Sequence, residues 1–215
     1  MAGGAGMTPA KRLLDILCAL GLMILLAVPF AIIVLVLLMR EGRPVFHVSE
    51  RMKAPGQPFM LWKLRTMRPA PPGADSGVSG GDKVARITPM GRFLRRSRLD
   101  EVPQLWNVLR GDMSFVGPRP PLRQYVERFP ELYARVLRSR PGITGLASLH
   151  FHRHEEWVLA RCTTPEETDA VYARICIPRK AHLDLMYQQH RSLCMDMALM
   201  VQTVAKVMPR RRPRP

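Results

Sequence analysis

The sequence RRSRLDEVPQLWNVLRGDMSFVGPRP, residues 95–120, places two adjacent carboxylates, Asp100 and Glu101, among arginines. The residues after them predict a short amphipathic helix, because apolar side chains recur at helical spacing and Gly111 is a typical stop. Pro103 fits within the first turn of such a helix. We therefore expect both acids at the start of this helix. Its apolar residues are Val102, Leu105, Val108 and Leu109.

The position of these acids indicates a chemical role. The positive end of a helix dipole and the nearby Arg95, Arg96 and Arg98 would favour the ionised form of a carboxylate. An ionised Asp100 could then act as a nucleophile or as a metal ligand. The alternative is that Asp100 and Glu101 only cap the helix and pair with surface arginines.

A short buried strand is predicted at residues 113–116, and it leads into the loop GPRP, residues 117–120. Proline on either side of Arg119 restricts the backbone. The guanidinium would therefore stand on a stiff loop, where it could bind a phosphate with two hydrogen bonds. An ordinary turn with a solvated arginine is the alternative.

Three motifs in order carry a family resemblance: KLRTM at residues 63–67, LDEVPQLWNVLRGDMSFVGPRP at 99–120 and RPGITG at 140–145. Together they resemble the bacterial sugar transferases, the monotopic polyprenyl-phosphate phosphoglycosyl transferases. The likeness covers residues 11–208, and several ordered motifs are more specific than one short pattern. The resemblance implies a membrane-associated α/β protein. Residues 1–43 would form an N-terminal re-entrant membrane helix, and residues 44–215 a small cytosolic α/β catalytic domain with interfacial amphipathic helices.

The resemblance also implies an enzyme on the cytoplasmic face of the bacterial inner membrane. Such an enzyme transfers a sugar 1-phosphate from a nucleotide diphosphate sugar, with UDP as the expected nucleotide, to polyprenyl (undecaprenyl) phosphate. A covalent aspartyl phosphosugar intermediate is implied, in the first membrane step of glycoconjugate assembly, whether exopolysaccharide, O-antigen, capsule or glycoprotein. The implied cofactor is Mg²⁺. The implied partners are both substrates and anionic inner-leaflet lipids, with no nucleic acid, and a homo-oligomer is left open.

The same resemblance assigns roles to individual residues. Asp100 would be the nucleophile, and Glu101 would be the metal ligand that holds Mg²⁺. Asp184 and Arg140 are further site candidates. Contacts with the substrate phosphates are implied for four basic residues: Lys63, Arg65, Arg95 and Arg119. From the sequence alone, the first two of these could instead form the polar face of a strand.

The composition agrees with anionic partners. The chain has 215 residues, with 33 Lys plus Arg against 17 Asp plus Glu, and a formal net charge of +16. Such a charge suits nucleotides, nucleic acid or the inner leaflet of a membrane, and it does not choose among them. The four cysteines are far apart and form no Cys-x-x-Cys pair, which argues against a metal cage or a disulfide framework and fits a reducing cytoplasm.

Residues 16–39 carry no charge and are long enough to cross a bilayer. Pro29 lies in the middle, and basic residues flank both ends, so the positive-inside rule gives no preferred orientation. A kinked span and a hairpin with both ends in the cytoplasm are both compatible with this pattern. The resemblance implies the re-entrant form, although Val28 replaces the serine that the family usually has before this proline. No small-residue cleavage site follows, so a signal peptide is not expected.

Residues 44–67 alternate loosely and predict short strands around a turn at residues 54–58. Residues 69–83 have the composition of a flexible loop, which would be either a flap over the site or an inert linker. Thr88 followed by Pro89 predicts the start of a helix that leads to Asp100.

The C-terminal half predicts a helix at residues 121–138, a strand that continues from the glycine turn toward His150, and a capped helix start at Thr164. The alternating His150, His152 and His154 suit either a metal site or solvated and core histidines. Many family members carry an Asn-Gly-Arg type motif in this region, and this sequence departs from it. A helix rich in Met and Leu precedes the basic tail, residues 209–215, which would lie on anionic lipid or be solvated.

Two other classes of function are compatible with these residues. A membrane-surface or nucleic-acid binding protein without catalysis would need the basic residues but not Asp100. A Mg²⁺-dependent diphosphate hydrolase would use the same acids and the same metal.

Overall fold

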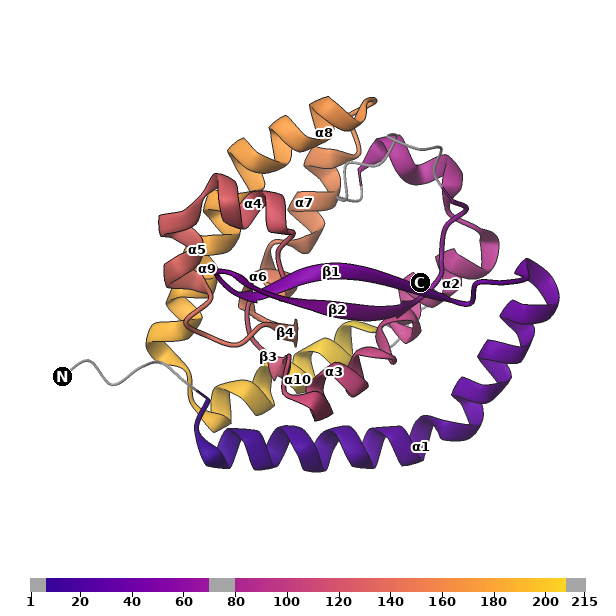
Figure 1. Cartoon of the computed structure of the whole chain (residues 1–215), viewed down its shortest axis with the longest axis horizontal. Helices are drawn as coiled ribbons and strands as arrows, with labels where there is room; N and C mark the ends of the chain where they lie inside the picture. The colour runs from indigo at the N-terminus through magenta and orange to yellow at the C-terminus, as the bar shows by residue number, and fades with distance from the viewer. Residues whose placement is uncertain (1–6, 70–79, 208–215) are drawn as a thin grey trace, which may run out of the picture.

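The computed structural model describes residues 7–69 and 80–207. One long helix, α1 (Pro9–Glu41), lies against a body built from two small sheets and several short helices (Figure 1). Most of the predicted flexible loop at residues 69–83 and all of the basic tail at residues 209–215 lie outside the described residues.

α1 begins where the sequence supplies a cap. The Thr8 side chain accepts a hydrogen bond from the Lys11 amide, and Pro9 occupies the first helical position. At 33 residues the helix is about 50 Å long. Figure 1 shows that it runs along the base of the molecule and then turns upward, and its internal proline is Pro29. A proline removes one helical hydrogen bond and kinks a helix, so the predicted break is a bend within one helix.

Some side chains near each end of α1 are buried in the body, whereas most of those in its middle are exposed. Ala19 belongs to one core cluster, together with Leu199 of the last helix, and Leu37 belongs to another. Between them the apolar side chains face outward, as at Ile24, which is 79% exposed. Among the described residues α1 is the helix long and apolar enough to cross a membrane.

A buried polar network fixes the first turns of α1. The Lys11 ammonium donates to Asp196 Oδ2 at 2.6 Å and to the Val116 carbonyl at 3.2 Å. The Tyr187 hydroxyl donates to the second oxygen of the same aspartate at 2.6 Å. Asp15 Oδ1 accepts from a main-chain amide of the neighbouring strand at 3.1 Å. The network thus joins the first turns of α1 to the strand that precedes the loop of Arg119.

The predicted hairpin is confirmed. Strands β1 (Phe46–Ala54) and β2 (Gln57–Leu64) are antiparallel, and Gly56 stands in the turn with φ of +70°. β2 ends at Leu64, so Arg65 lies just beyond the strand.

The predicted buried strand is confirmed as β3 (Ser114–Val116), which pairs in parallel with β4 (Gly142–Thr144). Gly111 ends the helix before it with φ of +83°, as predicted. The backbones come so close beyond β3 that a Cβ at Gly117 would collide with the Arg140 carbonyl oxygen.

Two predictions for the C-terminal half are wrong. The strand does not continue to His150, because leucines at helical spacing pack inward and form α6 (Leu146–His150), followed by α7 (His152–Leu159). The helix predicted at residues 121–138 is split at Phe129, since Pro130 cannot continue the hydrogen-bond ladder and starts a new helix. The two halves are α4 (Arg123–Arg128) and α5 (Pro130–Val136).

The predicted caps at Thr88 and Thr164 are confirmed, because each side chain accepts from the amide three residues on. They begin α2 (Pro89–Ser97) and α8 (Pro165–Val171). The remaining elements are the 3₁₀ turns η1 (Gly81–Arg86) and η2 (Leu99–Glu101), helix α3 (Gln104–Arg110), the π turn η3 (Tyr172–Cys176), and helices α9 (Ile177–His190) and α10 (Leu193–Val207).

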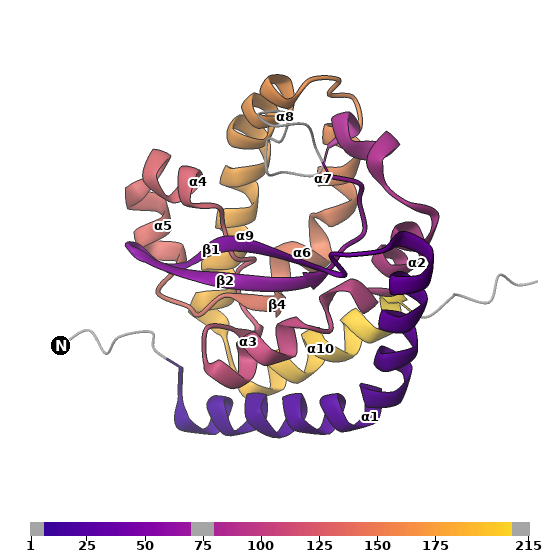
Figure 2. The same ribbon diagram turned by 45° about the vertical axis from the view of Figure 1, so that its right-hand side comes forward.

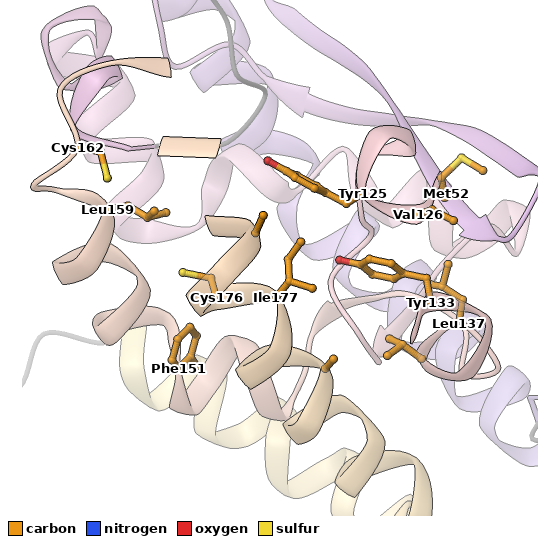
Figure 3. Close-up of a cluster of buried hydrophobic side chains, with 13 residues drawn as sticks. Met52, Tyr125, Val126, Tyr133, Leu137, Phe151, Leu159, Cys162, Cys176 and Ile177 are labelled. Atoms are coloured by element: carbon orange, nitrogen blue, oxygen red, sulfur yellow. The ribbon is translucent and has the colours of Figure 1, made fainter. Parts of the chain in front are cut away.

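The largest core cluster lies between α4, α5, α7 and α9, away from α1 (Figure 3). Tyr125 and Tyr133 point into it from α4 and α5, Cys176 from the last residue of η3, and Ile177 from the first residue of α9. Figure 2 shows the hairpin lying between this cluster and the helices α3 and α10. The hairpin therefore connects the two halves of the body.

Candidate active site

The two adjacent acids lie in η2, the single turn between α2 and α3. Arg98 adopts a left-handed conformation, with φ of +59°, and this turns the chain from α2 into η2. Asp100 is 8% exposed and Glu101 is 6% exposed. The sequence predicted both at the start of the following helix, whereas they precede α3 in a turn of their own. Because β2 and α2 pack against this turn, both carboxylates are buried.

One carboxylate oxygen of Glu101 contacts cations from three separate segments of the chain. Its Oε1 lies 3.3 Å from the Lys63 ammonium of β2, 3.3 Å from the Arg119 guanidinium and 3.6 Å from Arg98. Burial alone would raise the pKa of Glu101, but Lys63, Arg119 and Arg98 together lower it to about 2. Glu101 is therefore a fixed negative charge.

Asp100 differs from its neighbour. Burial and the charge of Glu101 raise the pKa of Asp100 above its ordinary value, against the opposite effect of nearby cations. The expectation that a helix dipole and arginines favour its ionised form was therefore wrong in direction, because desolvation has the larger effect. Its Oδ1 is buried and makes no hydrogen bond to the described part of the chain. Adjacent acids whose pKa values move apart are suited to different roles.

The pKa of Lys63 depends on both acids and on the neighbouring arginines. Burial and Arg119 lower its pKa to about 8, while Glu101 and Asp100 act in the other direction. Lys63 comes from β2, paired with His47 of β1, so the hairpin sets its position.

Arg119 stands on the stiff loop that the sequence predicted, with Pro118 and Pro120 both buried. Its side chain is 39% exposed, so it contacts Glu101 and also faces solvent. Arg95 of α2 donates to Thr66 Oγ1 and to Met67 Sδ, both at 2.9 Å, and its charge interacts with Asp100. The structure thus brings three of the four proposed phosphate ligands around the two acids.

Two of the predicted site residues lie elsewhere. The Arg65 guanidinium donates to the carbonyls of Glu41 at 2.7 Å and Gly42 at 3.0 Å, so it caps the end of α1. Arg140 lies near Arg12 and Asp15 at the other end of that helix. Arg65 and Arg140 therefore lie at opposite ends of α1 and not beside Asp100.

Asp184 lies on α9, and burial raises its pKa to about 7, with Lys180 opposing. Lys180 donates to Glu155 Oε1 at 3.0 Å and to the Tyr172 hydroxyl at 3.2 Å. The charge of Glu155 acts on Arg119, so this buried polar group borders the acidic cluster. No local pattern predicts this group, because Glu155 and Lys180 are 25 positions apart and lie on two different helices.

Further polar residues lie near the acids, and of these Gln104 was not singled out from the sequence. Gln104, one turn after Asp100, is buried, and its Nε2 has no hydrogen-bond partner among the described residues. The pKa of His152 is lowered by burial and by Arg98, and its ring lies 3.3 Å from Glu156. His154 instead stacks near Phe151 and Trp157. Within residues 7–69 and 80–207 these histidines form no metal cluster.

The two acids offer oxygen atoms of the kind that Mg²⁺ prefers. This ion is often held by one or two carboxylates plus substrate phosphates. The ion pairs of Glu101 in the described chain all end on Oε1. Its Oε2 and the buried Asp100 Oδ1 are oxygens of the right kind. No group of three His, Cys, Asp or Glu residues surrounds a metal position in the part of the chain described. The residues fit a magnesium ion completed by substrate oxygens.

The buried Asp100 Oδ1 makes no hydrogen bond in the described chain and lies next to a second carboxylate that contacts three cations, an arrangement that suits the transfer of a phosphoryl group. A family model described as bacterial sugar transferase matches residues 7–210. The chain belongs to this family, which confirms the resemblance. It is an enzyme of the undecaprenyl-phosphate sugar transferase type.

Three relatives have nearly the same identity to this chain but are covered to different extents. The uncharacterized sugar transferase EpsL of Bacillus subtilis is 33% identical over 201 residues, which cover 92% of this chain and 87% of the relative. The UDP-glucose:undecaprenyl-phosphate glucose-1-phosphate transferase of Caulobacter vibrioides is 35% identical over 204 residues, 92% of this chain and 69% of the relative. The undecaprenyl-phosphate galactose phosphotransferase of Salmonella typhimurium is 35% identical over 150 residues, which cover 63% of this chain and 31% of the relative. The sugars in the names of the last two relatives, glucose and galactose, differ.

Proposed function

We propose that this enzyme transfers a sugar 1-phosphate from a UDP-sugar to undecaprenyl phosphate through a covalent intermediate on Asp100. The observation that carries the proposal is the contrast between the two acids. Glu101 is neutralised by cations from three elements, whereas Asp100 Oδ1 is buried beside them with no hydrogen-bond partner in the described chain. The names of the relatives support the substrate classes.

In the first half-reaction, an oxygen of the Asp100 carboxylate attacks the phosphorus that carries the sugar. The bond from this phosphorus to the bridging oxygen of the diphosphate breaks, and a nucleoside monophosphate leaves. Lys63, Arg95 and Arg119 stabilise the negative charge on the phosphate oxygens. When bound at Glu101, Mg²⁺ would neutralise charge on the diphosphate. The sugar phosphate is now bonded to Asp100 as an acyl phosphate.

In the second half-reaction, a phosphate oxygen of the lipid attacks the same phosphorus. The bond to the Asp100 oxygen breaks, which restores the carboxylate and forms the lipid diphosphate sugar. The cations around Glu101 serve both steps, because the same phosphorus reacts twice. The reaction would be the first membrane step of glycoconjugate assembly.

We further propose that α1 enters the membrane and returns, so that the site faces the cytoplasm. Arg12, near its start, donates to the carbonyls of Val108 and Leu109 at 2.6 and 2.7 Å. Near its end, Arg65 donates to the Glu41 carbonyl. Both ends therefore bind the body that carries Asp100, whereas a spanning helix would separate them by the thickness of the bilayer. The exposed apolar middle of α1 would lie in the lipid.

Incubation of the enzyme with nucleotide sugar and Mg²⁺, without lipid, tests the covalent step. It should release about one nucleoside monophosphate per active site and then stop, and the two substrates should give ping-pong kinetics. A direct transfer would give no burst, and double-reciprocal lines for the two substrates would intersect.

A radiolabelled nucleotide-sugar assay with and without undecaprenyl phosphate separates this function from the alternatives. Label should enter the lipid phase only when the acceptor is present. Continuous release of sugar phosphate without lipid would indicate a hydrolase, and no turnover in either condition would indicate a binding protein.

A further inference from the structure

A groove of about 720 Å³ opens between the end of α1, the residues after β2 and the start of α2. Figure 2 shows the end of α1 beside α2. Three arginines line the groove, Arg40, Arg65 and Arg68, with one carboxylate, Glu41. Arg65 caps α1, whereas the Arg40 and Arg68 side chains make no hydrogen bond or ion pair within residues 7–69 and 80–207. The excess of cations makes the groove attractive to an anion.

The remaining wall is apolar and continues onto the membrane helix. Met67, Met90 and Phe93 line the groove, and Phe93 is largely exposed. Leu38 and Met39, on the last turns of α1, also face outward. An anion attached to a hydrocarbon chain therefore matches this surface better than a free phosphate does, because the chain would stay on the apolar side.

The groove and the acidic cluster share one wall. Met67 lines the groove, and its sulfur accepts from the Arg95 guanidinium at 2.9 Å. Arg95 in turn interacts with the charge of Asp100. Arg95 thus connects the groove wall at Met67 with the charge of Asp100.

We infer that this arginine groove is the docking site of the polyprenyl phosphate acceptor, an inference that rests on the function proposed above. The acceptor reaches the enzyme from the bilayer beside α1, and the groove presents its cations where the apolar surface of α1 ends. The volume lies within the usual range of ligand pockets, about 300–1,000 Å³. Arg65, predicted to bind a substrate phosphate, then acts on the lipid side of the reaction.

The two half-reactions allow a direct test. The double variant Arg40→Gln with Arg68→Gln, in nanodiscs, should release nucleoside monophosphate without lipid at the wild-type rate and amplitude. Its KM for undecaprenyl phosphate should rise about tenfold or more, while its KM for the nucleotide sugar stays unchanged. Lysine at both positions should restore much of the lipid affinity, because it keeps the charge. Arg138→Gln, at an exposed arginine outside the groove, is the matched control and should change neither constant.

An unchanged KM for the lipid, or an equal loss in both half-reactions, would overturn the inference. The inference would also be overturned if the double variant lost thermal stabilisation by phosphatidylglycerol while its KM for undecaprenyl phosphate stayed unchanged. The groove would then hold bulk phospholipid. Stabilisation of each protein by undecaprenyl phosphate, measured without nucleotide sugar, tests the groove by itself. If wild-type enzyme showed this stabilisation but no burst, the covalent mechanism would fail while the docking site stood.

Discussion

The Lys63 ammonium lies 3.3 Å from the Glu101 carboxylate, although the two residues are 38 positions apart in the sequence. The contact joins the hairpin to the turn that carries the adjacent acids. It also separates the roles of the two acids, because Glu101 contacts the cations, whereas Asp100, the residue before it, keeps a buried oxygen without a hydrogen bond in the described chain. The predictions below start from this division.

Asp100→Asn should abolish turnover, because the amide keeps the volume of the side chain but is no nucleophile. We expect kcat to fall by about four orders of magnitude or more. Intact-protein mass spectrometry after incubation with nucleotide sugar should show no added sugar phosphate. The variant should melt no lower than wild type, since burial disfavours the charge that it removes. A kcat close to wild type would exclude Asp100 as the nucleophile.

Glu101→Gln should reduce both the rate and the response to Mg²⁺. Three cations lose their shared carboxylate, and Lys63 is left with less compensation for its burial, so we expect a cost of about 3 kcal/mol in stability. The Mg²⁺ concentration for half-maximal activity should increase, as measured by titration at saturating substrates. An unchanged titration would remove Glu101 from the metal site.

Arg119→Lys should still form the covalent intermediate, but at lower yield. Lysine keeps the positive charge at Glu101 and loses the planar fork that binds two phosphate oxygens together. Mass spectrometry without lipid, at a fixed short time, should show about a tenfold smaller adduct peak than wild type. A wild-type yield in the lysine variant would mean that Arg119 does not contact the diphosphate.

Asp184→Asn should stabilise the protein more at high pH than at low pH. The pKa of Asp184 is raised to about 7 in the folded protein, so between about pH 4 and pH 7 the unfolded chain loses this proton first and wild-type stability falls. The total loss is about 4 kcal/mol, reached above pH 7. Melting temperatures of both proteins should agree near pH 4 and diverge up to pH 8. A constant difference across this range would show that the carboxyl ionises normally.

Cysteines placed singly at Ala10 and at His47, in a background without the native ones, should report the topology. Both positions are exposed and lie just inside and just beyond α1. If α1 re-enters the cytoplasm, neither should react with an impermeant thiol reagent in intact cells, and both should react after permeabilisation. Labelling of Ala10→Cys alone in intact cells would establish a spanning helix.

Features that depend on one turn of chain were predictable from the sequence. The caps at Thr88 and Thr164, the helix stop at Gly111 and the turn at residues 54–58 follow from local hydrogen bonding and backbone preference. The single helix predicted at residues 121–138 is two helices for an equally local reason, because Pro130 cannot continue the hydrogen-bond ladder.

Features of the site that depend on tertiary packing were not predictable. The direction of the Asp100 pKa shift follows from burial, which the neighbouring residues do not reveal. Arg65 and Lys63 are two positions apart, yet one caps α1 and the other contacts Glu101, because β2 ends between them. The Lys180 to Glu155 pair joins separate helices and leaves no local pattern.

The buried network around Lys11 bears on how a water-soluble version of this enzyme can be made. Deleting α1 would leave the buried Asp196 carboxylate without its ammonium, at a cost of about 3–5 kcal/mol, and would remove the Asp15 carboxylate from the Phe115 amide. The truncated protein would lose the support of the strand that precedes Arg119. Solubilisation should instead replace the outward apolar side chains in the middle of α1, such as Ile24 and Leu25, and retain its first turns as part of the catalytic body.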